Sequence, residues 1–279
     1  MNFFSPADVA QNYIQIGRSK ANTPVFKTFV LAVMAGLFIA ISGIAATTVA
    51  VAVEPAALGK LLGAIIFPGG LTMVLIAGSE LFTGNCLLII PVLEKTIRIR
   101  RMIKNLVLVY LGNMAGGLLL AAAVVFSHQV ALFDNGVAVS VITTATAKCS
   151  LSFGDALIRG ILCNFLVCVA VWISFAAKDI TGKIIGVFFP ILIFVLCGFE
   201  HSVANMYYIF AGLFAKAVPA FAEAASGIDT GMLTLGNMFL RNLLPVTIGN
   251  IIGGMACVGL PYWYIYLRRK KKMDILSED

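Results

Sequence analysis

Two polar interruptions within apolar stretches constrain this chain more than any other feature. The first is GSELFTGN at 78–85, the second is GFEHSVAN at 198–205, and both follow the pattern G-x-E-x-x-x-x-N. Each follows a Phe-Pro pair, at 67–68 and at 189–190. Ionisable groups at membrane depth are costly and usually face a bundle interior or a cavity, and irregular backbone is tolerated there only when protein or water surrounds it. The pair therefore predicts two broken membrane spans that enclose an internal site. The alternative is that Glu200 and His201 end an ordinary helix among lipid headgroups.

The composition excludes a soluble domain. Of 279 residues, 60% are hydrophobic and 12% are charged, which is typical of membrane proteins. The polar N-terminus is not a cleavable signal, so we expect the first apolar run to be retained as a span. The six cysteines form no C-x-x-C pattern, and the chain has only two histidines. We therefore expect no metal site, disulfide framework or cofactor.

Six apolar segments predict six membrane spans. They lie at 26–53, 58–91, 102–126, 153–177, 184–216 and 233–267, and the second and fifth are the broken ones. We predict a basic loop at 94–104, a polar segment at 128–152 with a turn at 134–136, a loop at 219–230 and a tail at 268–279. In segment 1–20, Ser5 and Pro6 indicate the start of an amphipathic helix, with Val9, Tyr13 and either Ile14 or Ile16 on one face. This helix is expected either on the membrane surface or packed against the bundle.

A second repeat relates the two halves of the chain. NLVLVYLGNMAGG, from Asn105, matches NLLPVTIGNIIGG, which begins 137 residues later at Asn242. The segments 26–126 and 153–267 are therefore predicted to be repeats of three spans, and an odd number of spans makes the repeats inverted. Asn113 and Asn250 stand beside paired glycines and are expected to bridge helices.

The distribution of basic residues predicts the orientation. The net charge of +7 is concentrated in a few loops, so it reports topology rather than nucleic-acid binding. Six spans place both termini on one side, and that side carries 15 of the 20 lysine and arginine residues. The positive-inside rule then places both termini in the cytoplasm.

Four segments carry a resemblance that covers essentially the whole chain: GSELFTGN, GFEHSVANM at 198–206, NLVLVYLGNMAGG, and PVTIGNIIGG at 245–254. In these motifs the chain resembles the formate/nitrite transporters. The resemblance implies one channel domain over 1–279 with an aquaporin-like, all-α fold of six transmembrane helices in two inverted repeats. It also implies a homopentamer in the inner membrane, with one pore per subunit and no enzymatic activity. The expected permeants are hydrosulfide, formate and nitrite, because overall likeness is greatest to the hydrosulfide channel branch.

The same resemblance implies the residues of the pore. Those expected to form the cytoplasmic constriction are Leu81, Phe82 and Phe194. Those expected to form the opposite constriction are Phe67 and Leu71. Those expected at or around a central site are Thr83, His201, Asn164 and Asn205. Lys148 and Glu200 are expected to shape the electrostatics around His201.

Physical chemistry suggests how such a pore can work. A bare anion does not cross an apolar constriction cheaply, since isolated charge in a low dielectric is strongly disfavoured. Positive potential from Lys148 and from half-helix N-termini can lower that cost. An unperturbed histidine has a pKa of about 6.5, so we expect His201 either to hold the anion as a hydrogen-bond donor or to lend it a proton. We expect Thr83 to donate a hydrogen bond and Glu200 to orient His201 or modify its titration.

Three other functions compete with a weak-acid channel. An enzyme using Glu80, Glu200 and His201 lacks a further ligand cluster. A neutral-solute channel with the aquaporin plan does not explain His201 beside Glu200, and the chain has no Asn-Pro-Ala pairs. A proton-coupled anion transporter would use the same residues as a channel, and only flux measurements separate the two.

Overall fold

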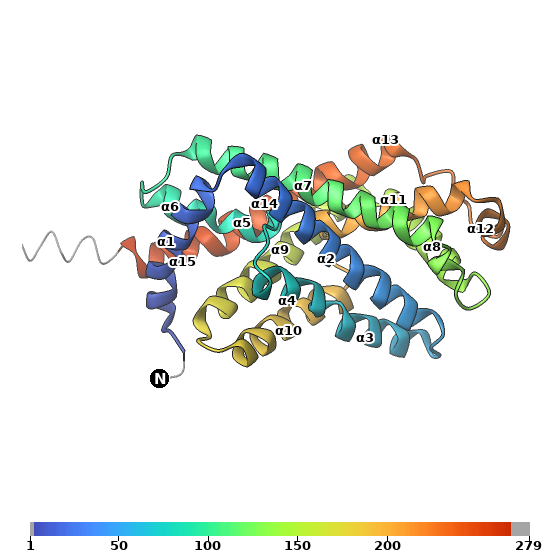
Figure 1. The fold of residues 1–279 in the computed structure, drawn as a ribbon, viewed down its shortest axis with the longest axis horizontal. Helices are drawn as coiled ribbons and strands as arrows, with labels where there is room; N and C mark the ends of the chain where they lie inside the picture. Colours follow the sequence, from blue (N-terminus) through green and yellow to red (C-terminus); the bar gives the residue numbers. More distant parts are fainter. Residues whose placement is uncertain (1–2, 269–279) are drawn as a thin grey trace, which may run out of the picture.

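The computed structural model describes residues 3–268, so the predicted tail at 268–279 lies, apart from Arg268, outside the described residues. The predicted all-helical fold is confirmed. Five helical segments in the described part are long and apolar enough to cross a membrane. Figure 1 shows α1 (Pro6–Asn22) and α15 (Leu260–Tyr266) at one end of the molecule, and α8 (Gly136–Cys149) and α12 (Pro219–Ala224) at the other. We call these the α1 end and the α8 end.

The remaining elements follow the predicted order of spans. In the first half they are α2 (Val25–Val51), α3 (Ala56–Ile66), α4 (Pro68–Ile76), α5 (Phe82–Asn85), the 3-10 turn η1 (Cys86–Leu88), α6 (Ile89–Leu93) and α7 (Ile99–Phe126). In the second half they are η2 (Gln129–Ala131), α9 (Phe153–Ala176), α10 (Ile180–Leu196), α11 (Ser202–Ala217), α13 (Leu235–Asn237), the π-helical η3 (Met238–Leu243), α14 (Leu244–Gly254) and the π-helical η4 (Met255–Gly259). The last predicted span is thus one helical run with two π-helical turns.

Both interruptions occur where the sequence predicts them. The backbone leaves the helix after Ile76 and resumes at Phe82, and it leaves again after Leu196 and resumes at Ser202. Gly78 and Gly198 adopt positive φ angles of 79° and 68°. Glycine reaches this left-handed region without the steric cost that a Cβ imposes, so each glycine lets the chain turn out of its helix.

Closely packed helix pairs hold each half together. α2 packs against α7 in the first half, and α9 packs against α14 in the second. A Cβ on Gly36 would lie 2.2 Å from the Asn113 carbonyl oxygen, and one on Gly253 would lie 2.2 Å from that of Ile161. Small residues at these crossings therefore let the two backbones touch, as in other membrane bundles.

The structure corrects the prediction for 128–152. The turn is present, with Asp134 and Asn135 at positive φ, but residues 136–149 form α8 rather than a polar connection. Val137, Val141 and Ala145 form a buried stripe at helical spacing, and α8 packs on α11 through it. α7 likewise begins at Ile99, inside the predicted basic loop, and the predicted loop at 219–230 contains α12.

The N-terminal helix packs against the bundle, which was one of the two predicted outcomes. Ser5 and Asp8 form a capping box at its start. Val9, Tyr13 and Ile14 are buried, and α1 contacts α6, α7, α9 and α15. α1 therefore closes the α1 end of the bundle.

Candidate functional site

A buried polar network surrounds the break at the α8 end. The Lys148 Nζ lies 3.0 Å and 3.1 Å from the two carboxylate oxygens of Glu200. Asn205 Nδ2 donates to Glu200 Oε2 at 2.6 Å and to Asn242 Oδ1 at 2.8 Å. The glutamate charge is therefore held by one lysine and two amides, which is the compensation that a buried carboxylate needs.

The break at the α1 end carries the same network. Lys20 Nζ donates to Glu80 Oε1 at 2.8 Å and to Asn85 Oδ1 at 3.1 Å. Asn85 Nδ2 donates to Glu80 Oε2 at 2.6 Å and to Asn105 Oδ1 at 2.8 Å. Each half thus supplies one lysine, one glutamate and two asparagines, as inverted repeats require.

Lys20 was missed by the sequence analysis, although a signal was present. Lys20 stands five residues before Val25, where α2 begins, and Lys148 stands five residues before Phe153, where α9 begins. Each repeat therefore starts with a helix whose last turn carries a lysine, α1 in the first half and α8 in the second.

Asn113 and Asn250 anchor the breaks to neighbouring helices, as predicted from their place beside paired glycines. Asn250 Oδ1 accepts the Ser202 N–H at 2.9 Å, and its Nδ2 donates to the Gly160 and Glu200 carbonyls at 2.8 Å and 3.0 Å. Asn113 makes the corresponding bonds with Phe82 N and the Ala32 and Glu80 carbonyls. These side chains satisfy backbone groups that the missing helical turns leave unpaired.

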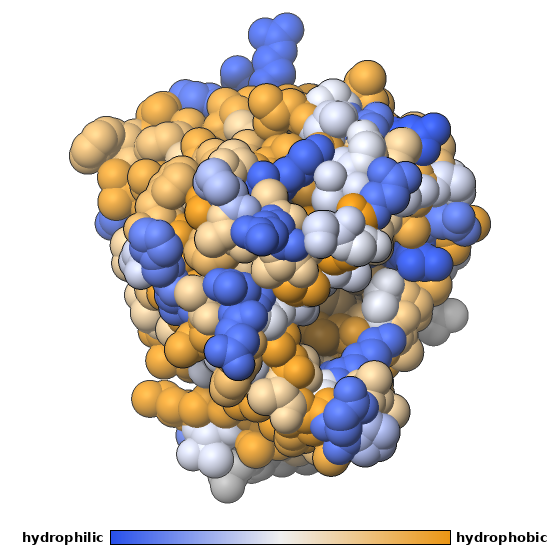
Figure 2. All heavy atoms as spheres, turned by 90° about the vertical axis from the view of Figure 1, so that its right-hand side faces the viewer, coloured by the Kyte–Doolittle hydropathy of each residue, from blue (hydrophilic) through white to orange (hydrophobic). Residues whose placement is uncertain are grey.

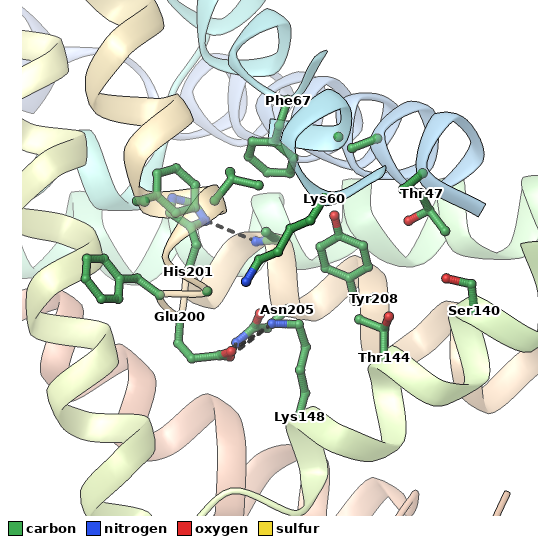
Figure 3. A pocket seen from close by; sticks show the side chains of 18 residues that line it. Thr47, Lys60, Phe67, Ser140, Thr144, Lys148, Glu200, His201, Asn205 and Tyr208 are labelled. Atoms are coloured by element: carbon green, nitrogen blue, oxygen red, sulfur yellow. Dashed lines mark hydrogen bonds and ion pairs between the residues drawn. The ribbon is translucent and has the colours of Figure 1, made fainter. Parts of the chain in front are cut away.

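A cavity of about 290 Å³ opens at the α8 end. Its lining residues include Lys60, Lys148, Glu200, His201 and Asn205, and Figure 3 shows these side chains grouped around the open space. Figure 2 faces this end and shows a recess among hydrophilic side chains. We call it the α8-side cavity. A smaller α1-side cavity of about 30 Å³ is lined by residues that include Lys20 and Asn85.

A narrow apolar space of about 10 Å³ lies between the two cavities. Its lining residues are Ile39, Phe67, Leu71, Leu81, Val167, Ile191, Phe194 and His201. A water molecule needs roughly 10–15 Å³ of such volume, so this space is closed to a column of water. His201 is the polar side chain among these lining residues.

The structure groups the predicted constriction residues differently. Phe67 and Phe194 meet edge to face with ring centroids 5.7 Å apart, and both also line the α8-side cavity. Leu71 and Leu81 also line the α1-side cavity. The pairing of Leu81 with Phe194, and of Phe67 with Leu71, is therefore wrong. The sequence motifs identified the residues but carried no information on which break each one faces.

Three predicted residues do not line these three spaces, namely Phe82, Thr83 and Asn164. The Phe82 ring packs edge to face on Tyr110, at 4.9 Å between centroids, and lines a separate apolar pocket with residues of α7 and α14. This corrects its assignment to a constriction. Asn164 donates to the carbonyls of Thr83 and Asn250, at 3.2 Å and 2.6 Å, so it supports the backbone behind the site.

His201 and Thr83 join the two breaks. His201 Nδ1 accepts the Ala204 N–H at 3.1 Å and so caps α11, while its Nε2 lies 2.9 Å from Thr83 Oγ1. Because Nδ1 accepts, a neutral ring carries its proton on Nε2, toward Thr83. The Phe194 ring stacks on His201 at 5.9 Å between centroids. Within residues 3–268, the Glu200 carboxylate bonds Lys148, Asn205 and Asn242 rather than His201, so the predicted orienting of His201 by Glu200 is wrong.

Helical spans, two breaks and a narrow passage between two cavities that each hold a lysine define a multi-pass membrane protein of the channel and transporter class. The chain belongs to the formate/nitrite transporter family, because the family model described as "Formate/nitrite transporter" matches residues 7–264.

Relatives and solved structures agree with this assignment. The chain is 38% identical to a probable formate transporter of Methanothermobacter thermautotrophicus, over 96% of this chain and 98% of that one. It is 39% identical to the formate channel FocA of Haemophilus influenzae, over 88% of this chain and 89% of that one. A solved pentameric formate channel with formate bound has a TM-score of 0.78 and 33% identity, covering 87% of this chain and 98% of that chain. These relatives are channels and transporters, which confirms the prediction that the protein is not an enzyme.

Proposed function

We propose that this protein is a channel for small monovalent anions of weak acids. The observation that carries the proposal is one imidazole in a closed apolar space between two cavities that each hold a lysine. An apolar wall excludes hydrated ions because a stripped charge there is costly. A single donor at the narrowest part favours a small solute with one acceptor group.

Formate is the first permeant to test, because the relatives described above are named for formate. Hydrosulfide, which overall sequence likeness favours, and nitrite are the further candidates. All three are compact conjugate bases of weak acids, so each can exchange a proton in the cavities and cross the apolar space as the neutral acid.

The hydrogen bonds around His201 support a donor role over a proton-lending one. The ring proton on Nε2 points toward Thr83 and can be shared with an anion that reaches this level. To lend a proton, the ring would first need to carry a second proton on Nδ1. Nδ1 already accepts a hydrogen bond from the Ala204 N–H, which opposes this protonation. We therefore propose that His201 and Thr83 hold the permeant while its proton comes from water in the cavities.

The assembly and orientation belong to the same proposal. We propose a homopentamer with a pore in each subunit, supported by the pentameric formate channel that matches this fold. The excess of basic residues on the side of both termini supports a cytoplasmic α1 end, in the inner membrane of the cell. The Lys148 side would then face outward.

Flux in proteoliposomes tests the proposal. We expect formate, nitrite and hydrosulfide to enter faster than chloride, and glycerol to enter no faster than in protein-free liposomes. Imposed pH gradients at a clamped membrane potential test the form in which the permeant crosses, since passage as the neutral acid accumulates formate on the alkaline side, whereas passage as the bare anion does not. Passage of glycerol without the anions would overturn the proposal in favour of a neutral-solute channel.

A further inference from the structure

The charged side chains that line the α8-side cavity differ in whether they are free to bind an anion. Lys60, Lys148 and Glu200 are its charged lining residues. Lys148 lies 3.0 Å from Glu200, and their side chains are only 15% and 6% exposed. A close ion pair has no net charge, so its field falls off quickly with distance. Lys148, to which the sequence analysis assigned the positive potential, is therefore largely neutralised.

Lys60 has the opposite character. It is exposed on α3, and no carboxylate of residues 3–268 lies within ion-pair distance of it. Its Nζ lies 3.9 Å from the position that a Cβ on Gly198 would occupy, next to the break that carries Glu200 and His201. Figure 3 shows the Lys60 side chain directed into the cavity between Phe67 and Lys148.

The helix geometry aligns Lys60 with the passage. Lys60 and Phe67 are seven residues apart, which is about two turns and roughly 10 Å along a helix, so they lie on nearly the same face. Both line the α8-side cavity, and Phe67 also lines the narrow space. An anion held by Lys60 therefore waits directly in front of the aromatic constriction.

The α1-side cavity offers no equivalent. Its basic lining residue is Lys20, which lies 2.8 Å from Glu80. The two networks are related by the inverted repeat, but within residues 3–268 an unpaired lysine lines only the α8-side cavity. α10, the partner of α3 in the other half, carries Lys183, which does not line the α1-side cavity.

We infer that Lys60, rather than Lys148, is the residue that binds the permeant anion in the α8-side cavity before it enters the passage. The inference rests on the proposed function and adds a specificity-determining residue to it. A free ammonium at the mouth selects monovalent anions over neutral solutes and raises their local concentration. It sets the concentration at which flux saturates, whereas the narrow space sets the maximal rate.

Formate flux in proteoliposomes tests this inference through its concentration dependence. We compare wild type with Lys60→Gln, Lys60→Arg and Arg159→Gln, the last being an exposed basic residue of α9 that does not line the cavity. At about 10 mM ionic strength, Lys60→Gln is expected to raise the half-saturating formate concentration about fivefold, the effect of one unit charge near an anion in water. Maximal flux is expected to stay within about twofold, and Lys60→Arg and Arg159→Gln to resemble wild type. At about 1 M salt, where the Debye length is near 3 Å, the difference should fall below about twofold.

Three results would overturn the inference. The first is a half-saturating concentration in Lys60→Gln equal to that of wild type. The second is an equal rise in Lys60→Arg, which would point to packing rather than charge. The third is a fall in maximal flux alone. Saturable formate flux in wild type with any of these results leaves the proposed function standing, whereas a wild type that carries no formate overturns both.

Discussion

Replacing Lys148 with methionine tests how the buried charges at the break are held. The Glu200 carboxylate accepts the Lys148 ammonium at 3.0 Å and 3.1 Å and the Asn205 amide at 2.6 Å. Methionine keeps the length of the side chain but removes the cation, so Glu200 is left as a buried charge with amide partners only. Breaking a buried pair in this way costs about 3–5 kcal/mol. Because the lysine side chain is 15% exposed and faces a cavity, we expect Lys148→Met to lower the free energy of unfolding by an amount at the lower end of this range, about 3 kcal/mol.

A double variant separates the pair from its environment. Lys148→Met combined with Glu200→Gln leaves no buried charge at this break, and the glutamine carbonyl still accepts the two asparagine amides. We expect it to be about 2 kcal/mol more stable than Lys148→Met alone, which is a coupling energy typical of residues in one network. Lys60→Met is the matched control, because an exposed, unpaired lysine is expected to change stability by less than about 0.5 kcal/mol.

The assay is unfolding of the detergent-solubilised protein by SDS titration, followed by tryptophan fluorescence. Stability differences between variants are read from the shift of the transition at constant slope. If the free energy of unfolding of Lys148→Met lies within about 0.5 kcal/mol of that of wild type, the Glu200 carboxylate does not depend on Lys148. The argument also fails if the double variant is less stable than Lys148→Met.

Two further variants test the packing of the bundle and of the passage. Gly36→Ala would place a Cβ 2.2 Å from the Asn113 carbonyl oxygen, so we expect the free energy of unfolding in SDS to fall by about 1–3 kcal/mol. Gly69→Ala is the control, because no atom lies within 4 Å of its new Cβ, and its stability should stay near wild type or increase. Phe194→Ala removes one ring of the aromatic constriction, so we expect chloride flux in proteoliposomes to rise several-fold relative to formate flux. An unchanged ratio of chloride flux to formate flux would show that the Phe194 ring does not contribute to the selectivity between these anions.

The sequence predicted the features that depend on local chemistry. Glycines at 78 and 198 and the glutamates that follow them located both breaks, because few other arrangements tolerate those residues in a membrane. The asparagine repeat located the inverted halves, and the matching side chains make equivalent bonds in each. The start of the N-terminal helix also followed directly from Ser5 and Pro6.

The features that depend on three-dimensional neighbours were not predictable in the same way. α8 was missed because the valines and alanines of its buried stripe are interspersed with threonines, so the segment resembles a polar connection. The direction of a side chain beside a break is set by helix rotation, so Phe82 could not be separated from Leu81 by sequence. The pairing of Lys20 with Glu80 joins residues far apart in the chain and needed the position of α1.

The most direct test of the central claim is anion flux through wild type and His201→Asn, measured in proteoliposomes at several pH values. Asparagine is smaller than histidine, so it removes the ring donor from the narrow space. We expect wild type to pass formate, nitrite or hydrosulfide much faster than chloride. We expect the variant to lose this selectivity but to keep a pH-dependent flux, because the permeant takes its proton from water in the cavities. Unchanged selectivity in His201→Asn would contradict the claim that the imidazole between the two cavities determines what passes, and loss of the pH dependence would show that His201 itself supplies the proton.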